Sequence, residues 1–104
     1  MTTEFIVVVV YDISNNKLRN YVEKTCKRYG LHHIQRSAFV GLMEESLRRE
    51  LYVELLNIVE QYGSEGDVCI RIYRIRISDY RHTLKIGELH GFDPDPEPWG
   101  VFIA

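Results

Sequence analysis

The N-terminal third of the chain joins one unbroken apolar run to one amphipathic stripe. Residues 5–10 are all apolar and mostly valine, and such a short run is typical of a central strand that is buried on both faces of its sheet. We expect this strand to span residues 5–12. Polar capping residues follow at 14–16, and apolar residues then recur with helical spacing as far as Gly30. This pattern predicts an amphipathic helix that ends at that glycine.

The middle of the chain predicts more extended structure and a second helix. Residues 31–43 resume a two-residue alternation, which fits either one long bent strand or two short strands. Residues 44–61 carry a second apolar stripe with helical spacing, and Gly63 with the "SEGD" segment after it ends the stripe. We therefore expect a helix over 44–61.

Another strand is predicted over residues 67–77, "DVCIRIYRIRI". Its aliphatic positions move by one residue between Ile72 and Ile75, which indicates either a β-bulge or a strand that changes what it packs against. A short alternating piece with Leu84 and Ile86 predicts one more strand. Two helices among four or so strands favour an α+β plait, with both helices on one face of the sheet and a short extra C-terminal strand.

The last residues form a separate segment. Residues 93–98 alternate acid and proline, which excludes a helix or a central strand and favours an extended chain, whereas the final "WGVFIA" is apolar. We expect one domain over 1–92 and a Pro-rich extended tail over 93–104. The apolar pieces at 84–87 and 99–103 need cover, on their own sheet edge or on that of a second copy. Because a domain of this size buries little surface alone, we favour exchange in a homodimer.

Length and composition indicate one soluble globular domain, with 104 residues of which 45% are apolar. No apolar run approaches the roughly 20 residues that span a bilayer, and the N-terminus has no basic leader. We therefore expect a cytoplasmic protein without membrane contact. Cys26 and Cys69 fall on apolar faces of predicted elements and form no metal or redox motif, so we expect both to be buried free thiols.

The net charge of −2 hides an uneven distribution along the chain. Residues 13–36 carry six Lys or Arg against one Glu, and residues 71–85 carry five against one Asp. Residues 37–70 and the residues from 86 onward are acidic instead. Phosphate binding responds to local fields rather than to net charge. The two basic blocks therefore either bind a nucleic-acid backbone or form ordinary solvated faces.

Asp12 stands where the first predicted strand leaves the sheet. Alternation places its side chain with Val8 and Val10, on the side opposite to Tyr11, and we expect a carboxylate at a strand end to be exposed. One role is a local contact with the start of the following helix. The other is a ligand for Mg²⁺, an ion that one or two carboxylates commonly hold together with several waters. One acid per subunit suffices if a dimer brings two together.

The same residues carry a resemblance to a known family. The stretch "VVVVYDISNNKLRNYVEKTCKRYGLHHIQRSAFVGLM", followed by "DVCIRIY", is similar to the CRISPR-associated Cas2 family over about residues 5–77, and "LKIG" resembles its last strand. The resemblance implies a ferredoxin-like βαββαβ fold, a symmetric dimer with exchanged last strands, and metal-dependent cleavage of RNA or DNA. It also implies a scaffold that bridges two dimers of the Cas1 integrase along prespacer DNA.

The family's site pattern is present only in part. Its acid pair after the first strand is Asn15-Asn16 here, one helix arginine is Tyr21, and one strand arginine is His33. Fewer anionic ligands weaken metal binding, and a neutral histidine clamps phosphate less well than arginine. The resemblance and the basic blocks together predict a catalytic, metal-binding Asp12 with Mg²⁺ or Mn²⁺, motif residues Tyr11, Ser37 and Phe39, and nucleic-acid contacts from Lys17, Arg19, Arg28 and Arg36.

Two functions of different classes remain open at this point. The favoured one is a metal-dependent endonuclease that cleaves RNA or DNA without sequence preference and also serves as a nucleic-acid-binding bridge to the Cas1 integrase. The alternative is a non-catalytic DNA-binding scaffold dimer, which needs a basic surface but no acid. A small-molecule sensor is disfavoured, because the sequence has no glycine-rich loop or cluster of ligand-binding polar residues.

Overall fold

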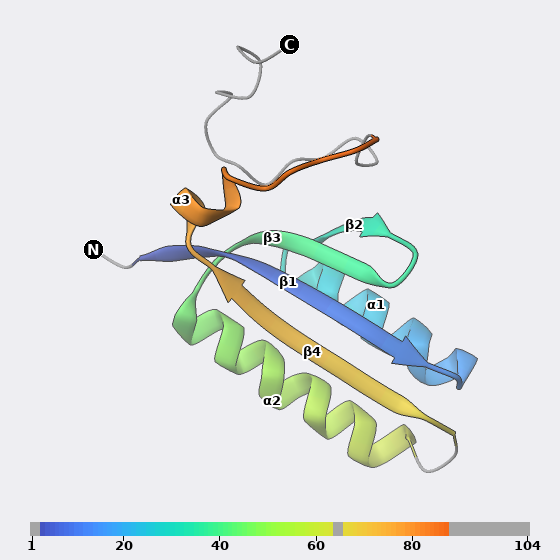
Figure 1. The fold of residues 1–104 in the computed structure, drawn as a ribbon. Helices are drawn as coiled ribbons and strands as arrows, with labels where there is room; N and C mark the ends of the chain where they lie inside the picture. Colours follow the sequence, from blue (N-terminus) through green and yellow to red (C-terminus); the bar gives the residue numbers. More distant parts are fainter. Residues whose placement is uncertain (1–2, 64–65, 88–104) are drawn as a thin grey trace.

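The chain forms one four-stranded antiparallel sheet with two long helices. The computed structural model describes residues 3–63 and 66–87. The strand order is β2-β3-β1-β4, and every neighbouring pair is antiparallel (Figure 1). This confirms the α+β class and the inner position of the first strand. The elements are β1 (Glu4–Ile13), α1 (Asn16–Arg28), β2 (His32–Gln35), β3 (Ala38–Glu44), α2 (Glu45–Tyr62), β4 (Val68–Ile75) and α3 (Ile77–Tyr80).

The segment 31–43 folds as two strands rather than as one bent strand. A turn at Arg36 and Ser37 separates β2 from β3. The pairing of these two strands shifts register between His33 and Gln35, so β2 is short and irregular where it approaches the turn. The alternating pattern correctly indicated extended structure on both sides of the turn, but no residue in the sequence marked where the chain reverses.

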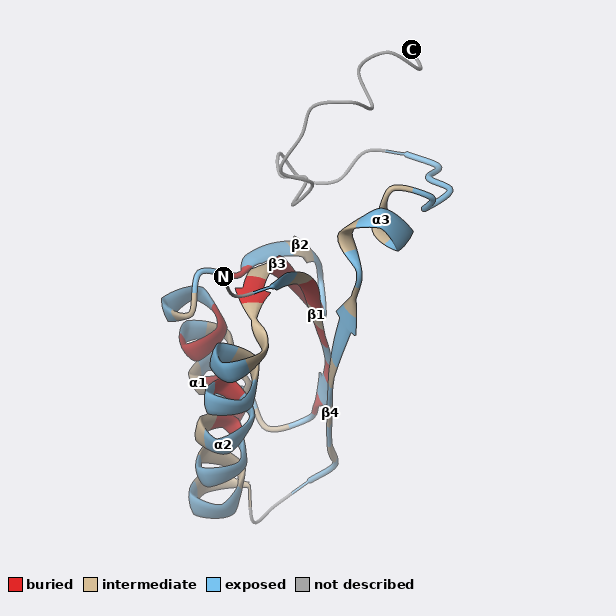
Figure 2. Ribbon diagram, turned by 90° about the vertical axis from the view of Figure 1, so that its left-hand side faces the viewer, coloured by how far each residue is buried: buried red, intermediate tan, exposed pale blue. Residues whose placement is uncertain are grey.

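The helices cover only one face of the sheet (Figure 2). Val7, Val9 and Tyr11 of β1 are buried against the helices. Alternate residues point the other way, and Val10 there keeps 42% of its surface exposed. The expectation that the first strand is buried on both faces is therefore wrong for the single chain, because no helix covers the second face. The core consists of Val7, Val9, Tyr11, Ile13, Leu18, Val22, Cys26, Leu31, Phe39, Met43, Leu51 and Leu55.

The apolar shift in the last long strand reflects a change of face and not a bulge. The pairing of β1 with β4 runs without interruption from Ile13 opposite Val68 to Ile6 opposite Ile75. Ile72 lies on the helix side, packed against the core, whereas parity places Ile75 on the uncovered face. Cys69 shares that uncovered face and is exposed. The expectation of a buried Cys69 is therefore wrong, whereas Cys26 is buried as expected.

The first helix begins at a cap that also fixes the start of β4. Asn15 is the N-cap, and its Oδ1 accepts from the backbone N–H of Leu18 at 3.0 Å. Ser14 contacts the residue that precedes β4 instead, because its Oγ accepts from the N–H of Asp67 at 2.9 Å. Gly66 has φ +91°, and an added Cβ would lie 2.3 Å from Ser14 Oγ. Only glycine fits this turn without moving the serine.

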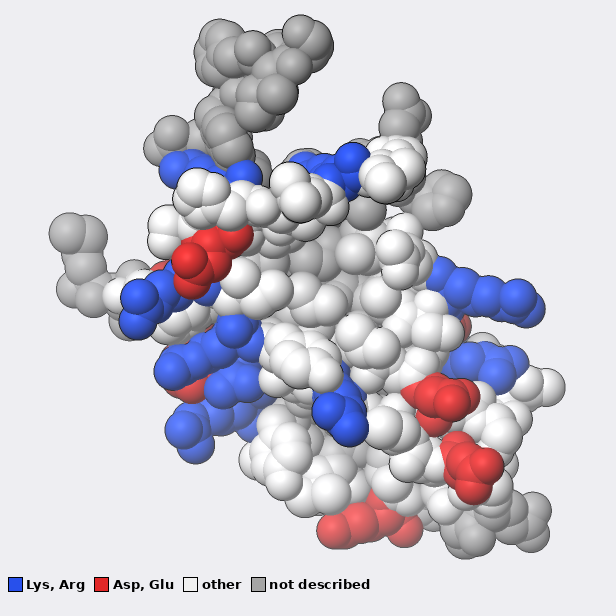
Figure 3. Space-filling model, in the orientation of Figure 1, with Lys and Arg blue, Asp and Glu red and all other residues white. Residues whose placement is uncertain are grey.

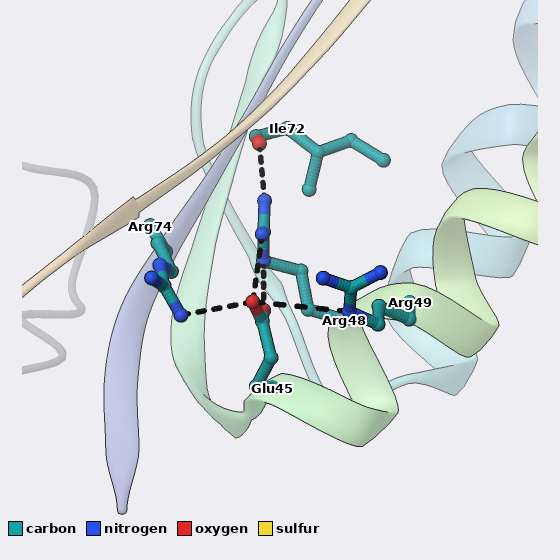
Figure 4. A network of polar contacts seen from close by, with 5 residues as sticks. All are labelled: Glu45, Arg48, Arg49, Ile72 and Arg74. Atoms are coloured by element: carbon teal, nitrogen blue, oxygen red, sulfur yellow. Dashed lines mark hydrogen bonds and ion pairs between the residues drawn. The ribbon is translucent and has the colours of Figure 1, made fainter.

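A cluster of charged side chains joins α2 to β4 (Figure 4). Glu45 accepts from Arg48 Nε at 2.5 Å and from Arg74 Nη1 at 2.8 Å. Arg48 also donates from Nη1 to the carbonyl oxygen of Ile72 at 2.9 Å. The hydrogen bond from Arg48 holds the pKa of the Glu45 carboxyl below its ordinary value. The cluster therefore fixes the start of the helix against the edge strand while the carboxylate is charged.

The C-terminal part of the described chain leaves the sheet after β4. Residues 81–87 follow α3 without forming a strand, and the side chains of Leu84 and Ile86 are almost fully exposed, at 97% and 106%. The predicted tail 93–104 lies outside the described residues, so the division at residue 92 stays a prediction. Among the described helices, none is long and apolar enough to cross a membrane.

Candidate functional site

Asp12 lies at the carboxyl end of β1, on the face of the sheet that the helices leave uncovered. It pairs across the strands with Cys69 of β4, and both residues are exposed. Among the described residues, none donates a hydrogen bond to the Asp12 carboxylate or forms an ion pair with it. Figure 3 shows this face with uncharged atoms at its centre and charged side chains around it. The carboxylate is therefore available to an incoming ligand.

Tyr11 points the opposite way, into the helix side of the sheet. Its side chain is buried, and its hydroxyl donates to Glu23 Oε2 of α1 at 2.6 Å. Burial and this hydrogen bond raise the pKa of the Tyr11 hydroxyl far above its ordinary value. A hydroxyl that holds its proton this firmly does not act as a general base near neutral pH. Tyr11 therefore has a structural role at the site.

The turn between β2 and β3 packs beside the end of β1. The backbone N–H of Tyr11 donates to the carbonyl of Ser37 at 3.0 Å. Phe39 is fully buried and stacks on two rings, with centroid distances of 6.0 Å to Tyr11 and 4.6 Å to His33. The motif residues thus form the packing that places the turn, and the exposed Arg36 side chain projects from it at the same end of the sheet as Asp12.

Two basic residues of α1 lie near the same end of the sheet. Arg19 donates from Nη1 to the carbonyl of Ile13 at 3.0 Å and from Nη2 to Asn16 Oδ1, so its guanidinium is held against the end of β1. Lys17 is exposed in the first turn of the helix, with its Nζ 5.9 Å from the centre of the Tyr62 ring. Lys17 is freer to reach a phosphate than Arg19.

Arg28 does not join this group. It lies in the last turn of α1, nine residues beyond Arg19, which corresponds to about 13 Å along a helix axis. Its Nη2 forms an ion pair with Glu54 of α2. The structure therefore brings Asp12, Lys17, Arg19 and Arg36 to one end of the molecule and places Arg28 at the other end of its helix.

The donor set fits a divalent ion only if a second chain contributes to it. Within the described residues, no three His, Cys, Asp or Glu side chains gather closely enough to hold a metal. A single exposed carboxylate suits Mg²⁺, which keeps several waters and accepts phosphate oxygens alongside one or two carboxylates. Asp12 on an uncovered sheet face meets that requirement when two copies of the face meet. The described residues of one chain thus supply one carboxylate toward a Mg²⁺ or Mn²⁺ ion, and a second copy of the face would supply another.

An apolar groove of about 480 Å³ runs between α2 and the outer edge of β4. Leu55, Leu56 and Val59 line it from the helix, and Ile70 and Ile72 line it from the strand. In the described part of the chain, β4 pairs only with β1, so its other edge has no partner strand. A strand added to this edge would bury side chains in the groove.

Sequence reasoning missed Glu23 and the contacts of His33. Glu23 is the only acid in the basic block 13–36, and this isolation was the available signal of a specific partner. His33 was noted only as a replacement for arginine, yet its Nε2 lies 3.2 Å from the carbonyl oxygen of Arg36. Neither contact could be predicted, because each depends on how the helix and the turn meet across β1.

Comparisons with known proteins agree with this fold. The family described as CRISPR associated protein Cas2 matches residues 5–83. A CRISPR-associated endoribonuclease Cas2 of Pyrobaculum aerophilum is 42% identical over 64 residues, which cover 62% of this chain and 68% of the relative. A Cas1/Cas2 endonuclease fusion of Thermoproteus tenax is also 42% identical over 64 residues, or 62% of this chain and 24% of the fusion. A solved Cas2 crystal structure superposes with a TM-score of 0.66 at 27% identity, over 88% of this chain and 95% of that one.

Proposed function

This chain belongs to the CRISPR-associated Cas2 family, and we propose that it is a metal-dependent endonuclease of RNA or DNA that works as a homodimer in CRISPR spacer acquisition. The observation that carries the proposal is Asp12, an exposed carboxylate without a partner among the described residues, on a sheet face without cover. The endoribonuclease name of the Pyrobaculum relative supports the same activity.

In the proposed dimer, the two uncovered faces meet and Asp12 of each subunit contributes one carboxylate to a shared site. Asp12 would hold Mg²⁺ or Mn²⁺ there, and the ion would supply positive charge for the phosphodiester and a water of lowered pKa. Through that ion, Asp12 would orient the scissile phosphate. Tyr11 is excluded as the base by its hydrogen bond to Glu23 and its raised pKa.

The flanking phosphates are proposed to contact Lys17 and Arg36. Both side chains are exposed at the Asp12 end of the sheet, and neither needs to read a base, so binding is expected to be independent of sequence. Arg19 adds positive charge from a more fixed position, because Ile13 and Asn16 hold its guanidinium. Arg28 is committed to Glu54 and is expected to contribute less.

The homodimer is proposed to form by exchange of the segment that carries Leu84 and Ile86. These two side chains are apolar and almost fully exposed in the single chain. The free edge of β4 and the groove beside it offer backbone partners and apolar cover on a second copy. Exchange would thus bury the two apolar side chains and give the free edge of β4 a partner strand.

A Cas1 protein is the proposed partner of the dimer. The Thermoproteus relative carries Cas1 and Cas2 in one chain, which keeps the two activities together in that organism. For this chain we propose a non-covalent assembly in which the dimer bridges Cas1 subunits and binds the nucleic acid between them.

The activity is tested by comparing Asp12→Asn with Asp67→Asn, which makes the same charge change at the same end of the sheet. Purified protein is incubated with labelled single-stranded RNA and duplex DNA, with Mg²⁺, with Mn²⁺ and with EDTA. The expected result is metal-dependent cleavage by the wild type and by Asp67→Asn and no cleavage by Asp12→Asn. Nucleic-acid affinity in EDTA at fixed salt should be kept or rise in both variants, because each removes one negative charge. If the wild type cuts neither substrate with either metal, catalysis is refuted and the non-catalytic scaffold remains.

A further inference from the structure

The Tyr11 hydroxyl connects three elements at the proposed nucleic-acid site. It belongs to β1, donates to Glu23 of α1 at 2.6 Å, and lies 3.3 Å from the carbonyl oxygen of Arg36 in the turn between β2 and β3. The His33 Nε2 of β2 lies 3.5 Å from the same hydroxyl. The Tyr11 hydroxyl has one hydrogen, so its hydrogen bond is shared between the two oxygens. The bond to the Glu23 carboxylate is the shorter and stronger, and the bond to the Arg36 carbonyl is the weaker.

The carbonyl of Arg36 is a fixed point of an otherwise exposed turn. Tyr11 and His33 both reach this oxygen, at 3.3 and 3.2 Å, and the next carbonyl, that of Ser37, accepts from the Tyr11 N–H at 3.0 Å. Because a carbonyl oxygen only accepts, the His33 Nε2 must carry the proton in its contact. Two successive peptide groups of the turn are therefore attached to the end of β1.

We infer that Tyr11 is a positioning residue that holds the turn so that the Arg36 guanidinium meets a nucleic-acid phosphate beside Asp12. The inference rests on the proposed function, because it assigns a role to a residue of that site. The Tyr11 hydroxyl lies on the far side of the sheet from Asp12 and is buried, so it contacts no nucleic acid itself. Its influence passes through the backbone of the turn.

A long side chain on a turn that can move loses both side-chain and backbone entropy when it binds a ligand. Arg36 is exposed, and its guanidinium must give up considerable rotamer freedom to bind a phosphate. If the turn can move, binding also costs backbone conformational entropy. A turn whose two carbonyls are already held by hydrogen bonds has lost that entropy before the phosphate binds. Removal of the hydroxyl deletes one donor to the Arg36 carbonyl and leaves the charge of the protein unchanged.

The test is a double-mutant cycle between Tyr11→Phe and Arg36→Ala, with Tyr21→Phe as the matched control. Tyr21 is a half-buried tyrosine of α1 that stacks on Tyr62 at 4.7 Å. Affinity for a labelled 25-base-pair duplex and for single-stranded RNA is measured by fluorescence anisotropy from low to high salt. Circular dichroism and the thermal midpoint of each variant establish that it is folded at the assay temperature.

We expect Tyr11→Phe to weaken binding about two- to tenfold, which corresponds to one hydrogen bond, and Tyr21→Phe to leave it unchanged. Arg36→Ala should weaken binding and reduce the salt slope by about one phosphate contact. The double variant should bind like Arg36→Ala alone, because the hydroxyl then has nothing to position.

The inference is overturned if Tyr11→Phe binds like the wild type, or if its loss adds in full to that of Arg36→Ala. It is also overturned if Arg36→Ala binds normally, an outcome that leaves the proposed function standing on the other basic residues. A wild type that binds neither nucleic acid overturns both.

Discussion

Leu84 and Ile86 provide the most direct test of the proposed dimer. Both side chains are almost fully exposed in the single chain, at 97% and 106% of their surface. Replacing both with serine therefore costs the folded monomer little. If strand exchange buries them in the groove of a second copy, each contributes about 1.5–3 kcal/mol to association. Reciprocal exchange buries two copies of each side chain in the dimer, so the double variant should lose about 6–12 kcal/mol of association free energy, or at least about ten-thousandfold in dimer affinity.

Sedimentation equilibrium over a range of protein concentrations measures this change, with the thermal midpoint of the diluted monomer as the check on folding. Val53→Ser is the matched control, because Val53 is a half-exposed aliphatic side chain on α2, 51% accessible, and does not line the groove beside β4. It should leave the dimer affinity unchanged. The reasoning is refuted if the wild type is monomeric, or if L84S/I86S dimerises as tightly as the wild type.

Two further predictions concern the uncovered face and the charged cluster. Mild oxidation should link two subunits through Cys69, which pairs with Asp12 on the exposed face, and Cys69→Ser should abolish the cross-linked band on a non-reducing gel. Cys26 is not expected to react, because burial raises the pKa of its thiol to about 12. A cross-linked band that persists in Cys69→Ser would therefore contradict the proposed packing. Glu45→Gln should lower the thermal midpoint at pH 7. The difference in midpoint from the wild type should shrink as pH falls through the pKa of Glu45, which is lowered below the ordinary value of 4.5, because the wild-type carboxylate is then protonated as well. Equal pH dependence of the two midpoints would show that the cluster does not stabilise the fold.

Local patterns were sufficient to predict α1, α2, β1, β4 and the inner position of β1, but not α3, and the strand expected at Leu84 and Ile86 does not form in the described chain. The valine run gave the strand, the spacing of Leu18, Val22 and Cys26 gave the helix face, and Gly63 marked the end of α2. The face of each β4 residue was harder to assign. Cys69 lies two residues from Arg71 and therefore shares its face of β4, whereas Ile70 and Ile72 lie on the other face. This spacing was the signal that Cys69 is exposed.

The site was predictable where it depends on strand parity and unpredictable where it depends on contacts between elements. Parity alone placed Asp12 on the face opposite to Tyr11. The basic blocks, in contrast, grouped Arg28 with Lys17, although the helix carries them to opposite ends and Glu54 pairs with Arg28. Charge counted along a sequence does not contain this information, because a helix spreads neighbouring charges over its whole length.

The hydrogen bond from Arg48 to the carbonyl of Ile72 has a consequence for how many copies can assemble. In the described sheet β4 is an edge strand, and an edge strand presents backbone groups of alternate residues outward. A fully open edge can seed indefinite growth of chains into fibres. The Arg48 side chain lies against the backbone of β4 at Ile72, so we expect it to hinder a docking strand that extends past this residue, whereas a short segment still docks. In the proposed exchange, two reciprocal dockings would close the assembly at a pair.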